Sequence, residues 1–273
     1  MKRSGVQFAL TNPMSPETDE EYNRWCAEHV PYSLLLPGRT SARRYRWADE
    51  SNQLAPKLTT AATHRYLTVY ELDDVSAVAD ARSLRPWLAE VAKAPTTSAL
   101  DTDGMMVSVY ELISENTTKP ALPPGVVAPT TDGAPDGPRA VVIVFSQPRS
   151  EADDAEYNRW YDEVHTGESL LLPGYVRSRR FRLAPPDDQA VPERVASWDY
   201  RYLTIYDIQN VHCVPLARQA MSWLKEISIE FASPALHPGG PMCWTFEQIF
   251  ETYERATLPD GIVVPVGENR VSP

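Results

Sequence analysis

The five histidines are the residues best suited to acid–base chemistry in this chain of 273 residues. An unperturbed imidazole has a pKa of about 6.5, so it can accept or donate a proton near neutral pH. Only His29 and His165 occupy equivalent positions, each shortly before the sequence Ser-Leu-Leu-Leu-Pro-Gly. Glu168 follows His165 by three residues, so both side chains would share a helix face. A carboxylate there would orient the imidazole and raise its basicity, whereas a packed, hydrogen-bonded histidine would be inert; both interpretations are open.

Two pairs of tyrosines could supply hydroxyl groups to the same chemistry. Tyr66 and Tyr70 have the same spacing as Tyr202 and Tyr206, within matching sequences. Side chains alternate along a strand, so each pair would lie on one face. The hydroxyls could line an apolar pocket and face a substrate oxygen, although core packing alone explains at least one tyrosine of each pair.

Arginines dominate the segment that precedes each tyrosine pair. In the second segment, alternation places Arg179 with Phe181 on one face of a strand and Arg180 with Arg182 on the other. An arginine directed into a pocket could hold a carboxylate, enolate or phenolate oxygen, and Arg180 is our candidate. For the segment as a whole we favour an edge strand that pairs with an acidic surface.

The elements that must position these residues come from an internal duplication. Four blocks recur in the same order, namely Glu21–Trp25 as Glu156–Trp160, Ser33–Gly38 as Ser169–Gly174, Arg65–Tyr70 as Arg201–Tyr206 and Ala81–Leu88 as Ala217–Leu224. The offset is 135 residues in the first block and 136 in the later ones, so a single-residue gap aligns them. The sequence therefore predicts two repeats of one structural unit.

Each repeat is predicted to run strand, helix, strand, strand, helix, strand. In the second repeat, Ala140–Phe145 is a short apolar strand, and Ser150 could cap the next helix, as Ser15 could in the first repeat. Leu-Pro-Gly ends that helix in both copies. Further strands are expected at 174–183, 105–113 and 242–250. This order is the ferredoxin-like motif, and two copies could pack their uncovered sheet faces together.

A longer stretch of the second repeat carries a family pattern. Tyr157–Glu168 is an aromatic-rich helix with a histidine followed by an acid, and in Leu172–Phe181 a Leu-Pro-Gly precedes a basic strand. These residues resemble the dimeric α/β-barrel superfamily, and most closely its EthD-like members. The resemblance implies an α+β fold in which two ferredoxin-like repeats pack sheet to sheet as an intramolecular barrel. It does not select a reaction, because such barrels include cofactor-free monooxygenases, lactone isomerases, polyketide cyclases, lyases and some haem enzymes.

The proline-rich middle of the chain has its own copy, since Leu122–Pro129 matches Leu258–Pro265. A featureless spacer would have no copy, and the apolar residues in both segments count against the alternative of two disordered tails. We expect a structured, extended arm to close each repeat. The predicted organisation is a first repeat over 1–130, a linker over 131–138 and a second repeat over 139–273.

Composition excludes several other classes of protein. The net charge of −11 repels phosphate backbones and argues against nucleic-acid binding. No apolar run is long enough to span a membrane. The three cysteines form no CxxC pair, and neither a metal-binding motif nor a glycine-rich phosphate loop is present. We expect a cytoplasmic protein without a metal or cofactor, with haem left open because one histidine suffices as its ligand.

These features predict a cofactor-independent enzyme of the lyase, dehydratase or isomerase type, acting on a small hydrophobic compound that is aromatic or carbonyl-bearing. The expected catalytic residues are His165, Glu168, Tyr202 and Tyr206, and the expected substrate-binding residues are His29, Tyr66, Tyr70, Trp160, Tyr161 and Arg180. The alternatives are a cofactor-free monooxygenase of phenolic or polyketide-like substrates and a non-catalytic ligand-binding or accessory protein. One chain suffices for a barrel, so a monomer or a homodimer of barrels is expected.

Overall fold

The order of helices and strands is the same in the two halves of the chain. The computed structural model describes residues 3–49, 64–80, 92–189, 200–250 and 252–255. The first half contains β1 (Gly5–Thr11), α1 (Asp19–Ser33), β2 (Arg39–Trp47), β3 (Tyr66–Leu72), α3 (Ser76–Asp80) and β4 (Met106–Asn116). The second half contains β5 (Ala140–Ser146), α5 (Asp154–Trp160), the π-helical turn η4 (Tyr161–His165), α6 (Thr166–Ser169), β6 (Tyr175–Leu183), β7 (Tyr202–Ile208), α7 (Cys213–Gln219), α8 (Met221–Ile227), β8 (Met242–Gln248) and β9 (Tyr253–Glu254). This order confirms the predicted ferredoxin-like architecture.

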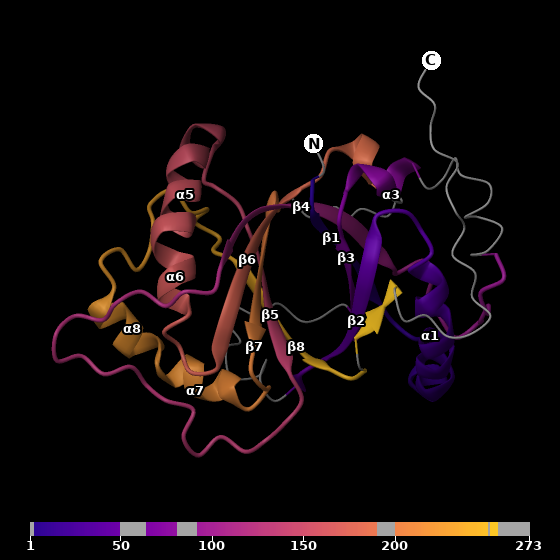
Figure 1. Cartoon of the computed structure of the whole chain (residues 1–273), viewed down its shortest axis with the longest axis horizontal. Coiled ribbons are helices and arrows are strands. Elements are labelled where there is room, and N and C mark those ends of the chain that lie inside the picture. Colours follow the sequence, from indigo (N-terminus) through magenta and orange to yellow (C-terminus); the bar gives the residue numbers. More distant parts are fainter. Residues whose placement is uncertain (1–2, 50–63, 81–91, 190–199, 251, 256–273) are drawn as a thin grey trace.

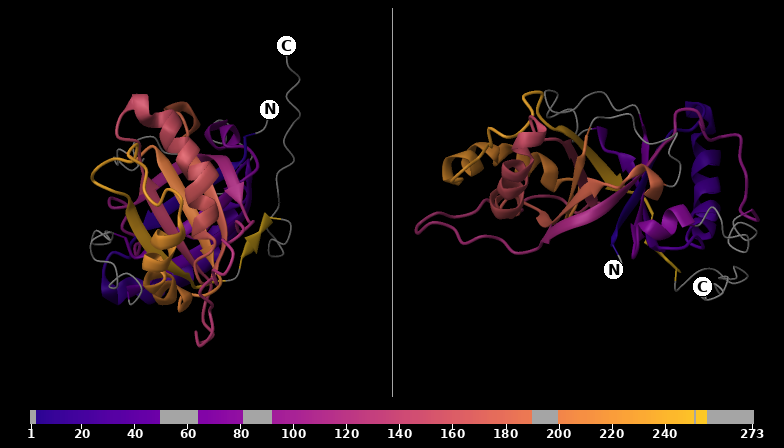
Figure 2. Two further views of the ribbon diagram at one scale, coloured as in Figure 1. Left: turned by 90° about the vertical axis from the view of Figure 1, so that its left-hand side faces the viewer. Right: turned by 90° about the horizontal axis from the view of Figure 1, so that it is seen from above.

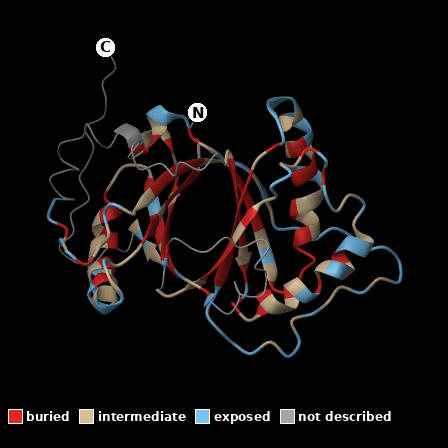
Figure 3. Cartoon of the chain, turned by 180° about the vertical axis from the view of Figure 1, so that it is seen from behind, coloured by how far each residue is buried: buried red, intermediate tan, exposed pale blue. Residues whose placement is uncertain are grey.

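Eight strands close into one antiparallel barrel that both halves share (Figures 1 and 3). The strand order is β2–β3–β1–β4 in the first half and β6–β7–β5–β8 in the second. The halves meet at two seams, where β4 pairs with β6 and β8 pairs with β2. Pairing of β2 with β3 completes the ring, which confirms an intramolecular α/β barrel. The arginine-rich strands β2 and β6 therefore have neighbours on both sides, and the expectation of an edge strand is wrong.

The interior of the barrel is a hydrophobic core to which both halves contribute. Its buried residues are Val6, Phe8, Leu10, Tyr45, Leu67, Val69, Tyr110, Val141, Ile143, Phe145, Phe181, Leu203, Ile205, Met242, Trp244 and Phe246. The ring centroids of Phe8 and Phe145, from opposite halves, lie 5.7 Å apart. Burying one large apolar side chain stabilises a fold by about 1.5–3 kcal/mol. The shared interior therefore holds the two halves together.

The helices lie outside the barrel, with α1 of the first half on the opposite side from α5 to α8 of the second (Figures 1 and 2). Each first helix is preceded by a short 3-10 turn, η1 (Pro16–Thr18) or η3 (Glu151–Asp153), that begins at the predicted serine. The Ser15 amide donates to Thr18 Oγ1 at 3.1 Å. None of the helices that the structure describes is both long and apolar enough to cross a membrane.

The Leu-Pro-Gly sequence ends the first helix of each half because its glycine adopts a left-handed backbone conformation. Gly38 has a φ of +81° and Gly174 a φ of +77°, which other residues rarely adopt. A Cβ at Gly38 would also lie 2.7 Å from the carbonyl oxygen of Asp74. Glycine at these two positions therefore allows the chain to turn directly from the helix into the arginine-rich strand.

The last strand of each half differs from its predicted length because of its neighbours at the seams. β4 continues to Asn116, beyond the predicted Ile113, since its last residues pair with β6 of the other half. β8 ends at Gln248, two residues before the predicted end at 250. A third 3-10 turn, η5 (Pro186–Asp188), follows β6. Strand ends are thus set by contacts between the halves that no local pattern encodes.

The segment that joins the halves crosses from one to the other. Residues 117–139 form neither helix nor strand, and Val127 is 79% exposed. Leu122, however, packs against a hydrophobic cluster of the second half that includes Leu171 and Leu224. The predicted copy of this arm at 258–265 lies outside the described residues, as does the repeated block at 81–88. The boundaries at 130 and 138 remain predictions.

Candidate functional site

A tryptophan and a histidine stack on each other in each half, on the helix that covers the sheet. The ring centroids lie 4.5 Å apart for Trp25 and His29, and 4.4 Å apart for Trp160 and His165. Both indole N–H groups donate to a backbone carbonyl at 2.7 Å. The two histidines are thus structurally equivalent, and both are partly buried.

The second half has one residue more between the stacked pair. Trp25 and His29 are four residues apart within α1, whereas Trp160 and His165 are five residues apart. The π-helical turn η4 accommodates the extra residue, so the stack is kept. The single-residue gap between the repeats therefore lies in η4. Such single π-turns inside α-helices occur frequently at functional sites.

The imidazole of His165 is held in its neutral form. Burial, together with the positive charge of Arg180, lowers the pKa of His165 from 6.5 to about 4. The ring of Tyr161 stands edge-on to the imidazole, with centroids 5.1 Å apart. Neither ring nitrogen forms a hydrogen bond with a described residue, so either could exchange a proton with a substrate. His29 differs, because its Nδ1 lies 3.4 Å from the carbonyl oxygen of Pro95.

Arg180 lies buried beneath η4, on the helix-facing side of β6. Its Nη1 donates to Asp162 Oδ1 at 2.5 Å and its Nη2 to Asn158 Oδ1 at 2.8 Å. The guanidinium also lies 4.6 Å from the centroid of the Tyr161 ring, within range of a cation–π interaction. The carboxylate partner of Arg180 therefore comes from the widened turn and not from an acidic surface.

Arg44 occupies the equivalent position in the first half without a carboxylate. Its Nη2 donates to Asn23 Oδ1 at 3.2 Å, while its Nε and Nη1 are buried and form no hydrogen bond. The rings of Tyr22, Tyr66 and Phe250 surround the guanidinium at 5.2 to 5.5 Å. The two halves share a scaffold of one arginine and one asparagine, and the inserted turn adds the acid to the second half only.

Tyr202 and Tyr66 belong to a hydrogen-bond network that both halves contain. The Tyr202 hydroxyl donates to Asp154 Oδ1 at 2.7 Å and accepts from Asn158 Nδ2 at 3.0 Å. Tyr66 makes the equivalent two hydrogen bonds, at 2.7 and 2.8 Å. A hydroxyl that is already bonded twice serves to hold helix and sheet together, so the catalytic role of Tyr202 stays a prediction.

Four buried polar atoms without a hydrogen-bond partner lie together on β6 and β7. They are Ser178 Oγ, Arg180 Nε, Thr204 Oγ1 and Tyr206 Oη. Ser178 pairs with Tyr206 and Arg180 with Thr204 across the two strands, so all four side chains share the helix-facing side. Burial raises the pKa of Tyr206 well above 10, although the nearby Ser169 hydroxyl opposes the shift, so the Tyr206 hydroxyl stays protonated and can donate. Because buried polar groups are nearly always hydrogen-bonded, this cluster could bind the oxygen atoms of a ligand.

Glu168 does not orient His165. Its carboxylate accepts hydrogen bonds from the Ser228 hydroxyl and, at 3.4 Å, from the Ile229 amide, both beyond the end of α8. Helical side chains lean toward the N-terminus, and the imidazole accordingly lies on Trp160 one turn back, away from Glu168. This part of the predicted site is wrong.

The structure brings together most of the predicted residues of the second half and separates them from those of the first. His165, Trp160, Tyr161, Arg180 and Tyr202 surround one region between α5–η4 and the sheet. Of the three predicted residues of the first half, His29 lies on α1, and Tyr66 and Tyr70 of β3 pack in clusters with residues of α1. Figure 1 shows α1 on the other side of the barrel from α5. Within the described residues, no group of three or more His, Cys, Asp or Glu side chains is suited to a metal ion.

Ion pairs inside the barrel connect the two halves on the opposite face of these strands. Arg179 Nη1 lies 2.7 and 2.8 Å from the two carboxylate oxygens of Glu71 in the other half. Arg43 also contacts Glu71, at 3.4 Å, and Asp207 lies 3.7 Å from Arg179 and 3.1 Å from Arg177. Side chains alternate between the two faces of a strand, so the position of Arg179 inside the barrel also places Arg177 of β6 and Arg43 of β2 inside. This alternation is the sequence pattern that could have predicted both residues.

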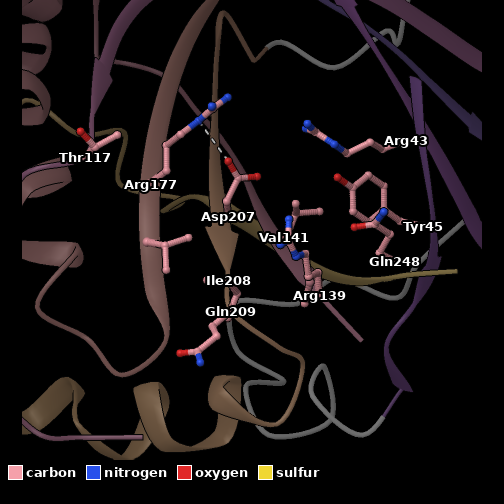
Figure 4. Close-up of a pocket in the computed structure, with 12 residues that line it drawn as sticks. Arg43, Tyr45, Thr117, Arg139, Val141, Arg177, Asp207, Ile208, Gln209 and Gln248 are labelled. Atoms are coloured by element: carbon pink, nitrogen blue, oxygen red, sulfur yellow. Dashed lines mark ion pairs between the residues drawn. The ribbon is translucent and has the colours of Figure 1, made fainter. Parts of the chain in front are cut away.

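A polar cavity of about 500 Å³ adjoins these ion pairs (Figure 4). Arg43, Tyr45 and Gln248 lie across it from Arg177 and Asp207. None of these residues was a sequence candidate; alternation could have placed Arg43 and Arg177 inside, but only closure of the barrel shows that they face one another. The cavity and the histidine site lie on opposite faces of the second half-sheet.

Comparison with known proteins identifies the fold of the chain but assigns it to no family. No protein-family profile and no curated protein sequence matches the chain. An anthrone oxidase-like protein of known structure matches with a TM-score of 0.52 and 10% identity, over 96% of this chain and 98% of that one. The chain has the dimeric α/β-barrel fold. A candidate monooxygenase of that fold from Lactobacillus acidophilus matches with a TM-score of 0.50 and 10% identity, over 93% and 97% of the two chains.

Proposed function

We propose that this α/β barrel is a cofactor-independent enzyme that moves a proton on a small aromatic or carbonyl-bearing compound, bound between η4 and the sheet of the second half. The observation that carries this proposal is the cluster of four unpartnered polar atoms on β6 and β7 beneath the helix that bears His165. Donors held in a water-poor site stabilise negative charge that develops on a substrate oxygen. The adjacent apolar rings suit the rest of a hydrophobic substrate.

His165 is the proposed acid–base group. With a pKa of about 4, its imidazole is neutral at pH 7 and can accept a proton without first losing one. The imidazolium that results is a strong acid in this site, because burial and the charge of Arg180 disfavour it. It therefore returns the proton readily to another atom of the substrate. This sequence of steps is what an isomerase, a lyase or a dehydratase requires.

Arg180 and the free hydroxyls are proposed to bind the substrate oxygen. Arg180 Nε, Ser178 Oγ, Thr204 Oγ1 and Tyr206 Oη can each donate a hydrogen bond to an enolate or phenolate. Asp162 and Asn158 hold the other guanidinium nitrogens, so the arginine is fixed before the substrate binds. Preorganised donors of this kind lower the barrier because they need not reorient during the reaction.

A cofactor-free oxygenase is the second candidate, supported by the similar fold of the anthrone oxidase-like protein together with the neutral imidazole. His165 would deprotonate an anthrone-like phenol, and the resulting anion would react with O₂. The CH₂ group of the substrate becomes a carbonyl, one oxygen atom of O₂ enters that carbonyl and the other leaves as water. Oxygen uptake with dithranol as the substrate distinguishes this reaction from an isomerisation, which consumes no oxygen.

Replacing His165 with alanine tests the proposal. Ligands are first found by thermal shift among aromatic ketones, lactones and phenols, and their turnover is then followed by product analysis. Loss of a general acid–base group reduces the rate by about 10²- to 10⁴-fold. The control is His237→Ala, which removes an imidazole whose one side-chain hydrogen bond among the described residues is accepted from the Gly239 amide of its own loop. Unchanged turnover in His165→Ala would show that His165 is not the acid–base group, whereas ligand binding without any turnover by the original protein would support the remaining alternative, a non-catalytic binding protein.

We also propose that the chain arose by tandem duplication of one EthD-like unit, which the equivalent Trp–His stacks and tyrosine networks support.

Haem does not fit the second unit well. Histidines that ligate a metal almost always donate their other ring N–H to a carboxylate or carbonyl, and His165 has no such partner among the described residues. We expect the purified protein to show no Soret band.

A further inference from the structure

The cavity inside the barrel is separate from the proposed active site. It lies at one open end of the barrel, where the charged residues of the interior begin and the hydrophobic core ends. Figure 4 shows residues of both halves projecting into it, with Arg43 and Tyr45 of the first half facing Asp207 and Arg177 of the second. A ligand here would contact the face of β6 and β7 opposite to the one beneath η4.

The lining of the cavity departs from the internal symmetry of the barrel. Matching backbone hydrogen bonds show which positions of the two halves correspond. The Gln248 amide donates to the Arg139 carbonyl, and the Leu112 amide donates to the Ser4 carbonyl, so Gln248 corresponds to Leu112 and Arg139 to Ser4. Likewise, Arg177 pairs with Asp207 as Ser41 pairs with Glu71. At three lining positions the second half therefore has a residue with more polar or charged groups than the first: Arg139 for Ser4, Arg177 for Ser41 and Gln248 for Leu112. These differences add two positive charges to one end of the barrel only.

The charges that line the cavity do not balance. Arg177 forms its ion pair with Asp207 at 3.1 Å, and Arg43 shares Glu71 with Arg179. Arg139 is exposed at the mouth of the cavity and forms no ion pair or side-chain hydrogen bond with a described residue. Arg177 also lies 3.6 Å from Glu115, so among the three arginines that line the cavity Arg139 is the one without a carboxylate partner among the described residues. In a protein with a net charge of −11, a local excess of positive charge marks a place where an anion is favoured.

We propose that this cavity binds a small organic carboxylate, which Arg139 and Arg43 attract and hold. The volume of about 500 Å³ lies in the range of small-molecule sites. Val141 and Val176 form an apolar part of the wall, which suits a hydrocarbon body and disfavours an inorganic anion alone. Burial raises the pKa of Tyr45 to about 12, so its hydroxyl stays protonated and can donate to the carboxylate.

Isothermal titration calorimetry with benzoate and hexanoate as probes tests this site on the whole protein. Benzamide is the neutral match for benzoate, and inorganic phosphate is the anion without an apolar body. Arg139→Ser gives the cavity the residue of the first half and removes no internal contact, so it should fold normally. Arg149→Ser is the matched control, because Arg149 is likewise exposed but does not line the cavity.

We expect a carboxylate to bind more tightly than benzamide or phosphate. Its affinity should fall about three- to tenfold in Arg139→Ser, as for an exposed charge, and about tenfold or more in Arg43→Gln, while Arg149→Ser binds as the original protein does. His165→Ala should leave this binding unchanged, which separates the cavity from the proposed active site. The proposal is overturned if neither probe binds at millimolar concentration, if phosphate binds equally well, or if Arg139→Ser has no effect.

Discussion

Replacing Glu71 with glutamine tests whether the two halves are joined by charge as well as by hydrophobic contact. Glu71 lies on β3 of the first half, and both of its carboxylate oxygens contact Arg179 Nη1 of the second half, at 2.7 and 2.8 Å. The Arg179 side chain is only 4% exposed and that of Glu71 24% exposed. Glutamine keeps the shape of the side chain and removes its charge, so the effect measures the ion pairs of Glu71 with Arg179 and, at 3.4 Å, with Arg43.

The expected loss follows from the burial of the arginine. Removing one partner of a buried ion pair costs about 3–5 kcal/mol, because the other charge is left uncompensated. Here the cost is smaller, since Asp207 remains 3.7 Å from Arg179 and water reaches one side of Glu71. We expect Glu71→Gln to lower the free energy of unfolding by about 2 kcal/mol.

Urea unfolding, monitored by tryptophan fluorescence, measures this loss. The control is Glu151→Gln, which breaks the ion pair between Glu151 and Arg201, whose side chains are 84% and 41% exposed. That pair should contribute less than about 1 kcal/mol. The slope of the unfolding free energy with urea should be the same in all variants, which shows that the same surface is exposed. The reasoning is refuted if Glu71→Gln is no less stable than Glu151→Gln.

Two further predictions concern η4. The pKa of His165 is about 4 in the folded protein and about 6.5 in the unfolded chain, so between these pH values the unfolded chain binds more protons. The free energy of unfolding should therefore fall by at most about 3 kcal/mol as the pH drops from about 6.5 to 4. His165→Gln should flatten this part of the pH profile. Asp162→Ala leaves the buried Arg180 without its carboxylate and should lower the free energy of unfolding by about 1–3 kcal/mol, seen as a lower urea midpoint. An unchanged midpoint would mean that Asn158 alone satisfies the arginine, as Asn23 does for Arg44.

The fold could be predicted because its signals are local and occur twice. Each half repeats the serine that begins its first helix, the Leu-Pro-Gly that ends it and the alternation along its strands. Two matching units with one uncovered sheet face each admit few arrangements, of which a closed barrel is the simplest. The seams were beyond reach, since pairing of β4 with β6 depends on register between distant residues. Arg180 was consequently assigned to an edge strand that does not exist.

The candidate site was predicted only in part, because one inserted residue changes its geometry. The gap between the repeats was visible in the sequence, but its expression as a π-helical turn depends on keeping His165 stacked on Trp160. That turn places Asp162 against Arg180, while Glu168 reaches toward Ser228. The unpartnered hydroxyls of Ser178 and Thr204 carried no sequence signal, since serine and threonine are common in strands and only burial makes them conspicuous.

The two seams also limit how much of the barrel can fold while the chain is being translated. The seam between β2 and β8 pairs Tyr45 with Gln248, so it cannot form until residue 248 has left the ribosome. At about 5–20 residues per second, the finished first half waits on the order of ten seconds with unpaired strands at β2 and β4. Exposed strand edges and an uncovered apolar face promote aggregation during such an interval. A tandem arrangement therefore supplies each half with its partner in the same chain, but the first half cannot complete its sheet until the second half has been translated.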